Sequence, residues 1–346
     1  MKKLILSMIA LVSSVAGYAQ VTEQLTATLQ SGETTKVFYG NDGLKSAIAE
    51  AADNDIITLS SGVFNNPGNI GKGVKIYGSG FEDDPATGVK LTRIEGGLNL
   101  QNEEKLVDGF SIEGAWINGD INAGNNNDNA TVLTNLKVVK CRFVSIIFRA
   151  ESSQIILRQN YISRDVTQSA NPKVTGLMIQ NCYINGTINR DFNSESGIAV
   201  DHCILAYNYS TYYGAISYHG PWYYTNTILR TYIAEGGVCY NCIGLQGYIE
   251  RCGTYANCYY DNNWGVLFGD EQDNLDYLKG TEPRSFTIAE TYLGTDGTVV
   301  GLHGGTYGWD KIPSTPRIIS STIASKVDAD GKLKVNIKAE ARSVTE

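Results

Sequence analysis

The sequence predicts an all-β solenoid, a chain of short strands wound into repeated coils. The 346 residues include 37 Gly and 21 Tyr but only 18% charged residues, a composition that favours strands with tight turns over helices. A two-strand pattern recurs seven times between residues 136 and 260. The copies are spaced by about twenty residues, the length of one coil in several solenoid classes.

Each copy of the pattern joins two short strands at a corner. In "GLMIQNCYI" the apolar residues Leu177 and Ile179 alternate with polar ones, and the alternation resumes out of phase at Cys182. Alternation places one face of a strand in the core, and the change of phase requires a corner. Asn181 falls at this corner, where asparagine tolerates the left-handed backbone conformation of a sharp turn. The inward positions that follow the corners, here called the anchors, are residues 141, 160, 182, 203, 227, 242 and 258.

An amphipathic helix is expected before the first coil. Its apolar face consists of Leu44, Ala47, Ile48 and Ala51. A turn over residues 53–55 then leads into a strand over residues 56–59. A helix in this position would close the open end of the solenoid, covering the core and the edge of the first strand.

These features resemble the right-handed parallel β-helices of the pectate-lyase-like class. The resemblance rests on the coil length, the asparagines at the corners and the helical cap, and it covers residues 36–265. It implies a right-handed parallel β-helix over residues 20–265, followed by a C-terminal β appendage over residues 266–346. In that appendage residues 333–339 alternate after an Asp-Gly turn, which predicts a β-hairpin. Similar endings occur in uncharacterised secreted bacterial β-helix proteins.

A second apolar row is expected on the outside of the solenoid, one position after each anchor. This outer stripe consists of Tyr161, Tyr183, Ile204, Ile228, Ile243 and Tyr259, with Arg142 at its start. An apolar stripe on the outside of a sheet normally lies under another segment. We expect the chain after residue 265 to cover it, or a second molecule to do so through self-association.

The N-terminus and the charge balance restrict location and partners. Residues 1–19 carry Lys2 and Lys3, then an apolar run and a small-x-small motif ending at Ala19, which predicts a secretory signal peptide. Without this leader the chain has 26 basic and 36 acidic residues, a net charge of −10 that disfavours nucleic acid. Because no other run approaches the ~20 apolar residues of a membrane helix, we expect a bacterial protein that is periplasmic, extracellular or on the cell surface, with no transmembrane span.

Six of the seven cysteines occupy inward positions of the repeat, and only Cys252 lies outside it. We expect buried, reduced thiols stacked in neighbouring coils, where cysteine acts as a small apolar residue. A disulfide is the alternative because the chain is predicted to be secreted, although parallel Cβ vectors disfavour one. A zinc site at the CxxC of Cys239 and Cys242 is not expected, since no second CxxC follows at zinc-ribbon spacing.

The resemblance implies that catalysis, if present, would follow polysaccharide lyases, which hold calcium through carboxylates and use a basic residue to remove a proton. Asp201 and His202 resemble part of a pectate-lyase motif, but they fall at a corner, and we interpret both as corner residues. The Arg-Asp pairs at 164–165 and 190–191 are interpreted as surface ion pairs. No catalytic residue is assigned. No metal or other cofactor is expected, and calcium would enter only with lyase activity.

The strongest functional signal is the uncharged, tyrosine-rich stretch over residues 207–224. Sugar rings stack on aromatic side chains, and tyrosine hydroxyls bond sugar hydroxyls. Trp222 and Tyr224 fit the inward positions and are expected in the core. The remaining candidates for a carbohydrate-binding surface are Tyr207, Tyr209, Tyr212, Tyr213, Tyr218, His219 and Tyr223. The alternative is that these are ordinary strand residues.

The sequence therefore predicts a secreted or cell-surface protein that binds a glycan or adheres to an extracellular protein without catalysis. The alternative is a polysaccharide lyase or glycoside hydrolase that acts on an acidic polysaccharide.

Overall fold

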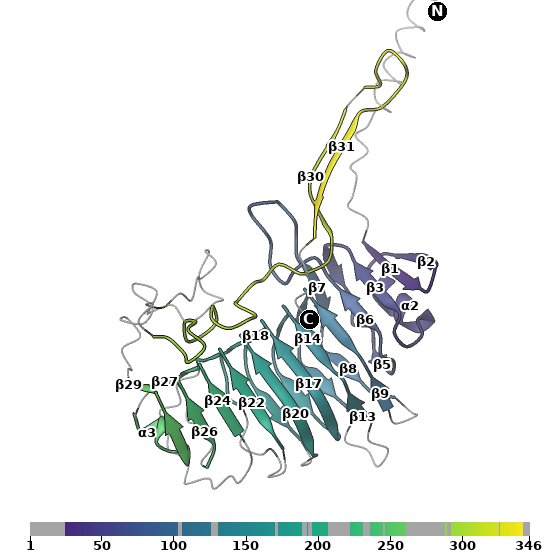
Figure 1. The fold of residues 1–346 in the computed structure, drawn as a ribbon. Coiled ribbons are helices and arrows are strands. Elements are labelled where there is room, and N and C mark those ends of the chain that lie inside the picture. The colour runs from purple at the N-terminus through teal and green to yellow at the C-terminus, as the bar shows by residue number, and fades with distance from the viewer. Residues whose placement is uncertain are drawn as a thin grey trace, which may run out of the picture.

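The computed structural model describes residues 25–102, 106–125, 131–169, 172–188, 192, 196–206, 222–230, 236–244, 246–260, 288, 292–324 and 326–341. This part of the chain forms a parallel β-helix in which strands from successive coils stack along the solenoid (Figure 1). The predicted fold class is confirmed, including the capping helix and the C-terminal hairpin.

Three sheets form the faces of the solenoid. Sheet A contains β1 (Thr26–Ser31), β2 (Thr34–Tyr39), β3 (Ile56–Leu59), β6 (Lys75–Tyr77), β9 (Leu106–Asp108), β10 (Ser111–Glu113), β13 (Val132–Thr134), β14 (Lys137–Val139), β17 (Ser152–Arg158), β20 (Val174–Gln180), β22 (Ile198–Asp201), β24 (Trp222–Thr225), β26 (Val238–Tyr240) and β28 (Thr254–Ala256). Sheet B contains β4 (Gly62–Phe64), β7 (Thr92–Glu95), β11 (Trp116–Asn118), β15 (Arg142–Phe143), β18 (Tyr161–Ile162), β21 (Tyr183–Ile184), β23 (Ile204–Leu205), β25 (Ile228–Leu229), β27 (Ile243–Gly244) and β29 (Tyr259–Tyr260). Sheet C contains β5 (Asn69–Ile70), β8 (Leu98–Leu100), β12 (Ile121–Ala123), β16 (Ile146–Phe148) and β19 (Val166–Gln168).

The strands of sheet A pair in the register that the repeat predicts. Leu157 pairs with Ile179, and Ile179 pairs with Val200 in the next coil. The same inward row contains Ile57, Ile76, Ile112, Val138, Tyr224 and Cys239, all buried. Stacking of such rows gives one hydrophobic core along the solenoid, so each coil buries its apolar face against its neighbours.

The corners between sheets A and B form a column of left-handed residues, here called the corner ladder. It consists of Gly114, Lys140, Gln159, Asn181, His202, Asn226, Asn241 and Asn257, with φ between 48° and 73°. The prediction that asparagine occupies left-handed corners is confirmed. Lysine and glutamine adopt this conformation less readily than asparagine and histidine, so their presence requires a further cause, which the contacts of Lys140 and Gln159 with the chain after residue 291 supply.

The helix α2 (Gly43–Glu50) closes the N-terminal end as predicted. It buries Leu44, Ala47 and Ile48 beneath it. The strand β1 pairs antiparallel with β3, so the first coil does not present a free edge.

The anchor cysteines are free thiols in the core. Cys141, Cys182, Cys203 and Cys242 are fully buried. Each coil links to the next through them; for example, Cys182 Sγ accepts a hydrogen bond from the backbone N–H of Asn160 at 3.4 Å. Burial raises the pKa of the Cys141 thiol to about 12, so this side chain stays neutral. The prediction of stacked, reduced thiols is confirmed for these positions.

Residues 292–316, here called the strap, cover the outer stripe. Its tyrosines and isoleucines, from Tyr161 to Ile243, are at most 1% exposed. They form a second hydrophobic cluster with Val300 and Leu302 of the strap and the partly buried Trp309. The expectation that the chain after residue 265 covers the stripe is confirmed. Self-association through the stripe loses its basis, because the stripe is buried within the chain.

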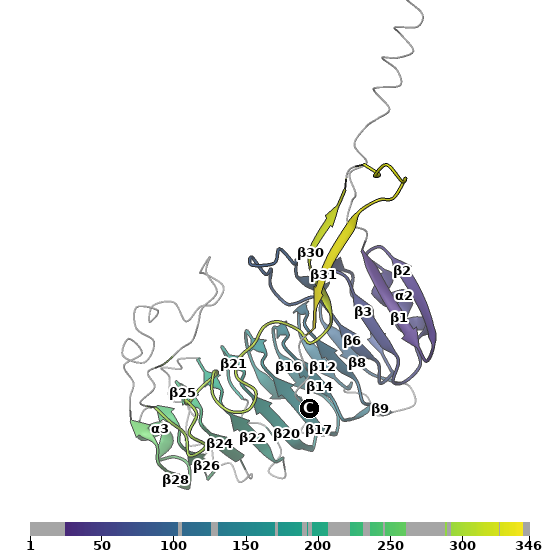
Figure 2. The same cartoon turned by 45° about the horizontal axis from the view of Figure 1, so that its top comes forward.

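The strands β30 (Arg317–Ile323) and β31 (Val335–Glu340) form an antiparallel hairpin that projects away from the solenoid (Figure 2). The alternation of residues 333–339 is typical of a half-buried strand, yet every residue of β31 from Val335 to Ala339 is exposed, so neither face of this strand is covered. The hairpin is therefore confirmed as secondary structure but does not pack on the solenoid. No helix in the described ranges, including the short α3 (Gln246–Ile249), is long and apolar enough to cross a bilayer.

Candidate functional site

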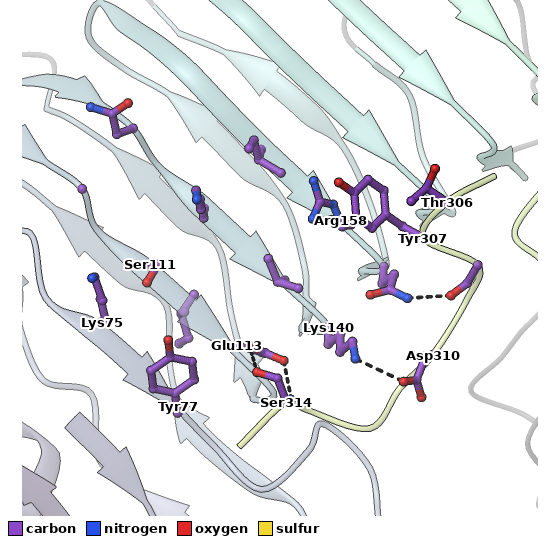
Figure 3. Close-up of a pocket in the computed structure, with 18 of the residues that line it drawn as sticks. Lys75, Tyr77, Ser111, Glu113, Lys140, Arg158, Thr306, Tyr307, Asp310 and Ser314 are labelled. Carbon is purple, nitrogen blue, oxygen red and sulfur yellow. Dashed lines mark hydrogen bonds and ion pairs between the residues drawn. The ribbon is translucent and has the colours of Figure 1, made fainter. Parts of the chain in front are cut away.

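A groove of about 1120 Å³ lies on the outer face of sheet A, between its N-terminal strands and the strap (Figure 3). The strands β6, β10, β14 and β17 supply its floor, and residues 306–314 of the strap supply a wall. The side chains that give the groove its chemistry are Lys75, Tyr77, Glu113, Lys137, Lys140 and Arg158 from the solenoid, with Tyr307, Asp310 and Ser314 from the strap.

The floor follows from strand alternation. On each of these strands the residue in the middle of the outward-inward-outward triplet points to the core, so its two neighbours point into the groove. One row contains Lys75, Ser111, Lys137 and Ile156, and the second contains Tyr77, Glu113, Val139 and Arg158. Neighbouring strands lie about 4.8 Å apart, so Lys75 and Lys137 stand roughly 10 Å apart along the solenoid.

The wall is held in place by the corner ladder, whose side chains point out of the solenoid toward the strap. Gln159 Nε2 donates to the Gly308 carbonyl at 2.6 Å. Asn181 Nδ2 donates to the carbonyls of Leu302 and Gly304 at 2.8 and 2.9 Å. The strap thus runs from Asn241, which bonds Thr295, back toward the N-terminal coils. The contacts explain why polar residues other than asparagine accept left-handed corners here.

The final part of the strap is fixed by contacts with charged groups of the groove. Lys140 Nζ lies 3.2 Å from Asp310 Oδ2 and donates to the Ile312 carbonyl at 2.6 Å. The Glu113 carboxylate accepts hydrogen bonds from the backbone N–H and hydroxyl of Ser314 at 2.6 and 2.7 Å. Both acidic groups of the groove are therefore engaged with the strap or with the residue that holds it.

An aromatic and cationic contact forms the far end of the groove. The guanidinium of Arg158 stacks on the ring of Tyr307 at 3.5 Å from its centroid. Its Nε and Nη2 also donate to Gln180 Oε1 at 3.2 and 3.1 Å. These contacts fix the planes of both side chains, so Arg158 and Tyr307 present a preformed surface.

The groove keeps an excess of positive charge. Four basic groups line it against two acidic ones, in a chain whose formal net charge is −8. The ammonium groups of Lys75 and Lys137 make no hydrogen bond or ion pair with any described residue. Burial and the charge of Glu113 raise the pKa of Tyr77, so its hydroxyl stays protonated and can donate. The groove therefore offers two uncommitted cations and a phenol.

The structure places one predicted carbohydrate-binding residue on this same face. Tyr223 on β24 is 48% exposed and pairs with Ala199, which continues the row of Lys137 and Ile156 through Met178. Trp222 and Tyr224 point inward and are buried, as predicted. The other candidates, Tyr207, Tyr209, Tyr212, Tyr213, Tyr218 and His219, lie outside the described residues.

Asp201 and His202 form a clamp on the strap. The His202 ring is 2% exposed; its Nδ1 lies 3.0 Å from Asp201 Oδ2, out of line for a hydrogen bond, and its Nε2 lies 3.4 Å from Asp296 of the strap. Burial opposes ionisation of Asp201, but the adjacent His202 ring and hydrogen bonds from Thr225 and Asn226 hold its pKa below the usual value. His202 has a φ of 49° in the corner ladder, so the interpretation as a corner residue is confirmed.

The Arg-Asp loop pairs did not form the predicted contact where the structure describes them. Asp165 Oδ1 accepts hydrogen bonds from the backbone N–H and hydroxyl of Thr187 at 2.7 and 2.9 Å. These bonds tie the carboxylate to the next coil, and Arg164 forms no ion pair with it, so the prediction at 164–165 is wrong. The pair at 190–191 lies outside the described residues. Across the described ranges, no three His, Cys, Asp or Glu side chains are arranged to hold a metal ion.

Sequence reasoning missed the groove because one of its walls comes from a distant segment. The positions two and four residues before each anchor point outward, and they include Lys137, Arg158 and Tyr223. The repeat was therefore sufficient to predict which strand residues form the floor. The strap contributes Tyr307 and Asp310, more than 140 residues after the strands that they face. Comparisons with protein-family models, with curated proteins and with solved structures gave no match.

Proposed function

We propose that this chain is a secreted, non-catalytic glycan-binding protein that holds an acidic polysaccharide in the groove of sheet A. The observation that carries the proposal is the pair of uncommitted lysines, Lys75 and Lys137, in a groove with Tyr77 and the stacked Arg158 and Tyr307. We further propose that the β-helix belongs to the pectate-lyase-like class that the coil pattern resembles, but without the lyase activity of that class.

The groups of the groove match the chemistry of an acidic glycan. Lysine ammonium groups bind carboxylate or sulfate oxygens as mobile point charges, and a protonated Tyr77 donates to a sugar oxygen. Apolar faces of sugar rings stack on aromatic rings, and the exposed Tyr223 offers such a ring on the same face. Because the floor repeats along the solenoid about every 4.8 Å, a linear chain lying along the axis would meet similar positions on successive strands.

The acidic groups of the groove favour binding over catalysis. A lyase of the resembled class needs carboxylates free to hold calcium, and a glycoside hydrolase needs two carboxyl groups facing the scissile bond. Glu113 is hydrogen-bonded to Ser314, and Asp310 pairs with Lys140. Neither faces an open substrate position, so the groove as described lacks an acid-base pair.

The test is a binding measurement on the mature chain with acidic and neutral polysaccharides, with calcium and with chelator, while products are followed by absorbance of unsaturated ends and by reducing-end assay. We expect binding to acidic polysaccharides that weakens as salt increases, without products. The double variant Lys75→Ala with Lys137→Ala should bind at least about tenfold more weakly, the loss expected from two charged contacts.

The matched control is the double variant Lys334→Ala with Lys338→Ala, which removes the same charge from the exposed hairpin. It should bind like the wild type. Equal losses of affinity in both double variants would mean that only the net charge of the protein matters, and would contradict binding in the groove. Unsaturated products would contradict the non-catalytic assignment and favour the lyase alternative.

A further inference from the structure

The C-terminal hairpin is a two-stranded sheet with a large exposed surface. In the described ranges this sheet contains only β30 and β31, and Figure 2 shows it standing away from the solenoid. Its aliphatic side chains Ile318, Ile323, Val335 and Ile337 are each at least 50% exposed. A two-stranded hairpin alone is marginally stable in water, whereas three or more strands with an apolar face form a stable sheet. A further strand beside the hairpin would therefore stabilise it.

The two edges of the hairpin differ in how readily they can pair with another strand. β30 begins after Pro316, and its register with β31 shifts between Ile318 and Ser320. Prolines and bulges protect the edge of a sheet from pairing with another chain. β31 has neither, because its sequence VNIKAE contains no proline and its residues follow one another without a gap in the register. The edge of β31 is therefore the one open to pairing.

The open edge of β31 offers the backbone groups of alternate residues. The Lys334 carbonyl accepts a hydrogen bond from the backbone N–H of Ala324 at 2.9 Å. Successive residues of an antiparallel strand direct their backbone groups to opposite sides, so the even-numbered residues of β31 face β30. The N–H and C=O groups of Val335, Ile337 and Ala339 then face away from β30. These are the groups that an added strand would bond.

We propose that β31 pairs antiparallel with β31 of a second copy of the chain, so that the two hairpins form one four-stranded sheet about a two-fold axis. In this register Ile337 lies opposite Ile337 of the second copy. Val335 lies opposite Ala339, and Lys334 lies opposite Glu340, each pair occurring twice by symmetry. The residues whose backbone groups face the open edge thus bond one another, and their side chains form one uncharged face.

The charges of β31 favour this register over its neighbours. Lys334 opposite Glu340 is a pair of opposite charges, and Lys338 lies opposite the neutral Asn336. A shift of two residues in one direction places Lys338 opposite itself, and a shift in the other direction places it opposite Lys334. Like charges directly opposite each other destabilise a sheet. A shift of one residue would set the apolar face of one hairpin beside the polar face of the other.

The first test is analytical ultracentrifugation of the mature chain from roughly 1 µM to roughly 0.5 mM, a range suited to a small interface. We expect a monomer–dimer equilibrium. Ile337→Pro removes a backbone N–H that faces the open edge rather than β30, so it should abolish the dimer. Its Tm should match that of the wild type, since the hairpin does not pack on the solenoid.

Two charge variants test the register without altering the backbone. Lys334→Glu places two carboxylates opposite each other at both ends of the paired strands and should raise the dissociation constant of the dimer about tenfold. The matched control Lys338→Glu makes the same change of charge opposite the neutral Asn336. It should raise the dissociation constant by less than about threefold.

Three results would overturn the proposal. The first is a chain that stays monomeric over the whole range; if it also co-sediments with vesicles of phosphatidylglycerol and phosphatidylcholine, the exposed aliphatic side chains bind a lipid surface instead. The second is a dimer that Ile337→Pro leaves intact, which would place the contact elsewhere on the molecule. The third is equal weakening by Lys334→Glu and Lys338→Glu, which would mean that net charge, and not the pairing of Lys334 with Glu340, controls the association.

Discussion

The outward-facing rows of side chains on two faces of the same solenoid differ in burial. On sheet B the row after the anchors is apolar, from Tyr161 to Ile243, and lies buried under the strap. On sheet A the outward rows carry Lys75, Lys137 and Arg158 and stay open as a groove. Both rows arise from one repeat with one register, so the period alone does not separate a covered face from a binding face. The residue types in each row, and the route of the strap, make that distinction.

The strap can serve both faces because it follows the edge between them. Its apolar residues, such as Leu302, turn toward sheet B, while Tyr307 and Asp310 border the groove on sheet A. The corner ladder lies along that edge and bonds the strap backbone. The ladder therefore acts as a set of attachment points as well as a set of turns.

The largest expected effect comes from opening the covered face. Leu302→Ala removes a fully buried side chain between the strap and sheet B and should lower the free energy of unfolding by about 2–5 kcal/mol. Leu293→Ala, on the same strap but 43% exposed, should change it by less than about 0.5 kcal/mol. Urea unfolding followed by circular dichroism measures both. Similar losses for the two variants would contradict a buried contact at Leu302.

A smaller loss is expected at the corner ladder, where two causes can be separated. Asn181→Ala removes two buried hydrogen bonds to the strap and places alanine at a φ of 49°, for a loss of about 2–4 kcal/mol. Asn181→Gly removes the same bonds but adopts this φ without strain, so it should lose about 1 kcal/mol less than alanine does. Thermal and urea unfolding report the difference. A glycine variant as stable as the wild type would show that the strap bonds add nothing to stability.

The fold was predictable because each coil repeats the same local rule. The change of phase around Cys182 fixed the corner, the inward rows and the outer stripe, and the helix from Leu44 followed from its apolar face. The hairpin was predictable from the Asp-Gly turn, but its exposure was not, since alternation does not reveal which surface a strand meets.

Of the candidate site, the strand residues could be predicted from the sequence, but the strap residues could not. Arg158 and Tyr223 stand at repeat positions, so their outward direction follows from the sequence. Tyr307 and Asp310 reach the groove through long-range contacts of the corner ladder, and no local pattern encodes such pairings. Asp165 is a further example of a contact that sequence does not reveal. Its sequence neighbour Arg164 suggested an ion pair, but its carboxylate instead accepts hydrogen bonds from Thr187 in the next coil.

The open face can be altered without disturbing the covered one. Asp310→Asn removes the carboxylate that pairs with Lys140 but keeps an acceptor for the backbone N–H of Ile312. Freed from this pair, Lys140 should join Lys75 and Lys137 in binding an acidic glycan, and affinity should rise by up to about fivefold. Asp330→Asn removes an equal charge from the exposed hairpin and should leave affinity unchanged. Titration calorimetry distinguishes them, and weaker binding by Asp310→Asn would mean that the strap pair supports the groove.

The smallest expected effect is a pH dependence of the clamp at Asp201. Burial opposes ionisation of Asp201, but its folded-state pKa lies below the ordinary value of 3.8, because the adjacent His202 and hydrogen bonds from Thr225 and Asn226 outweigh burial. The ionised carboxylate therefore stabilises the fold above about pH 4, and this contribution disappears as pH falls through the folded-state pKa. Since the side chain is about one-third exposed, the loss should be under about 1 kcal/mol. Urea unfolding at pH 3 and pH 6 should show a smaller pH dependence for Asp201→Asn than for the wild type, and equal slopes would assign the acid sensitivity to other carboxylates. Equal pH dependence in the two proteins would also imply that the clamp is held by the backbone shape of the corner rather than by its charge. His202 would then resemble the uncharged corner residues Asn181 and Asn226 on either side of it.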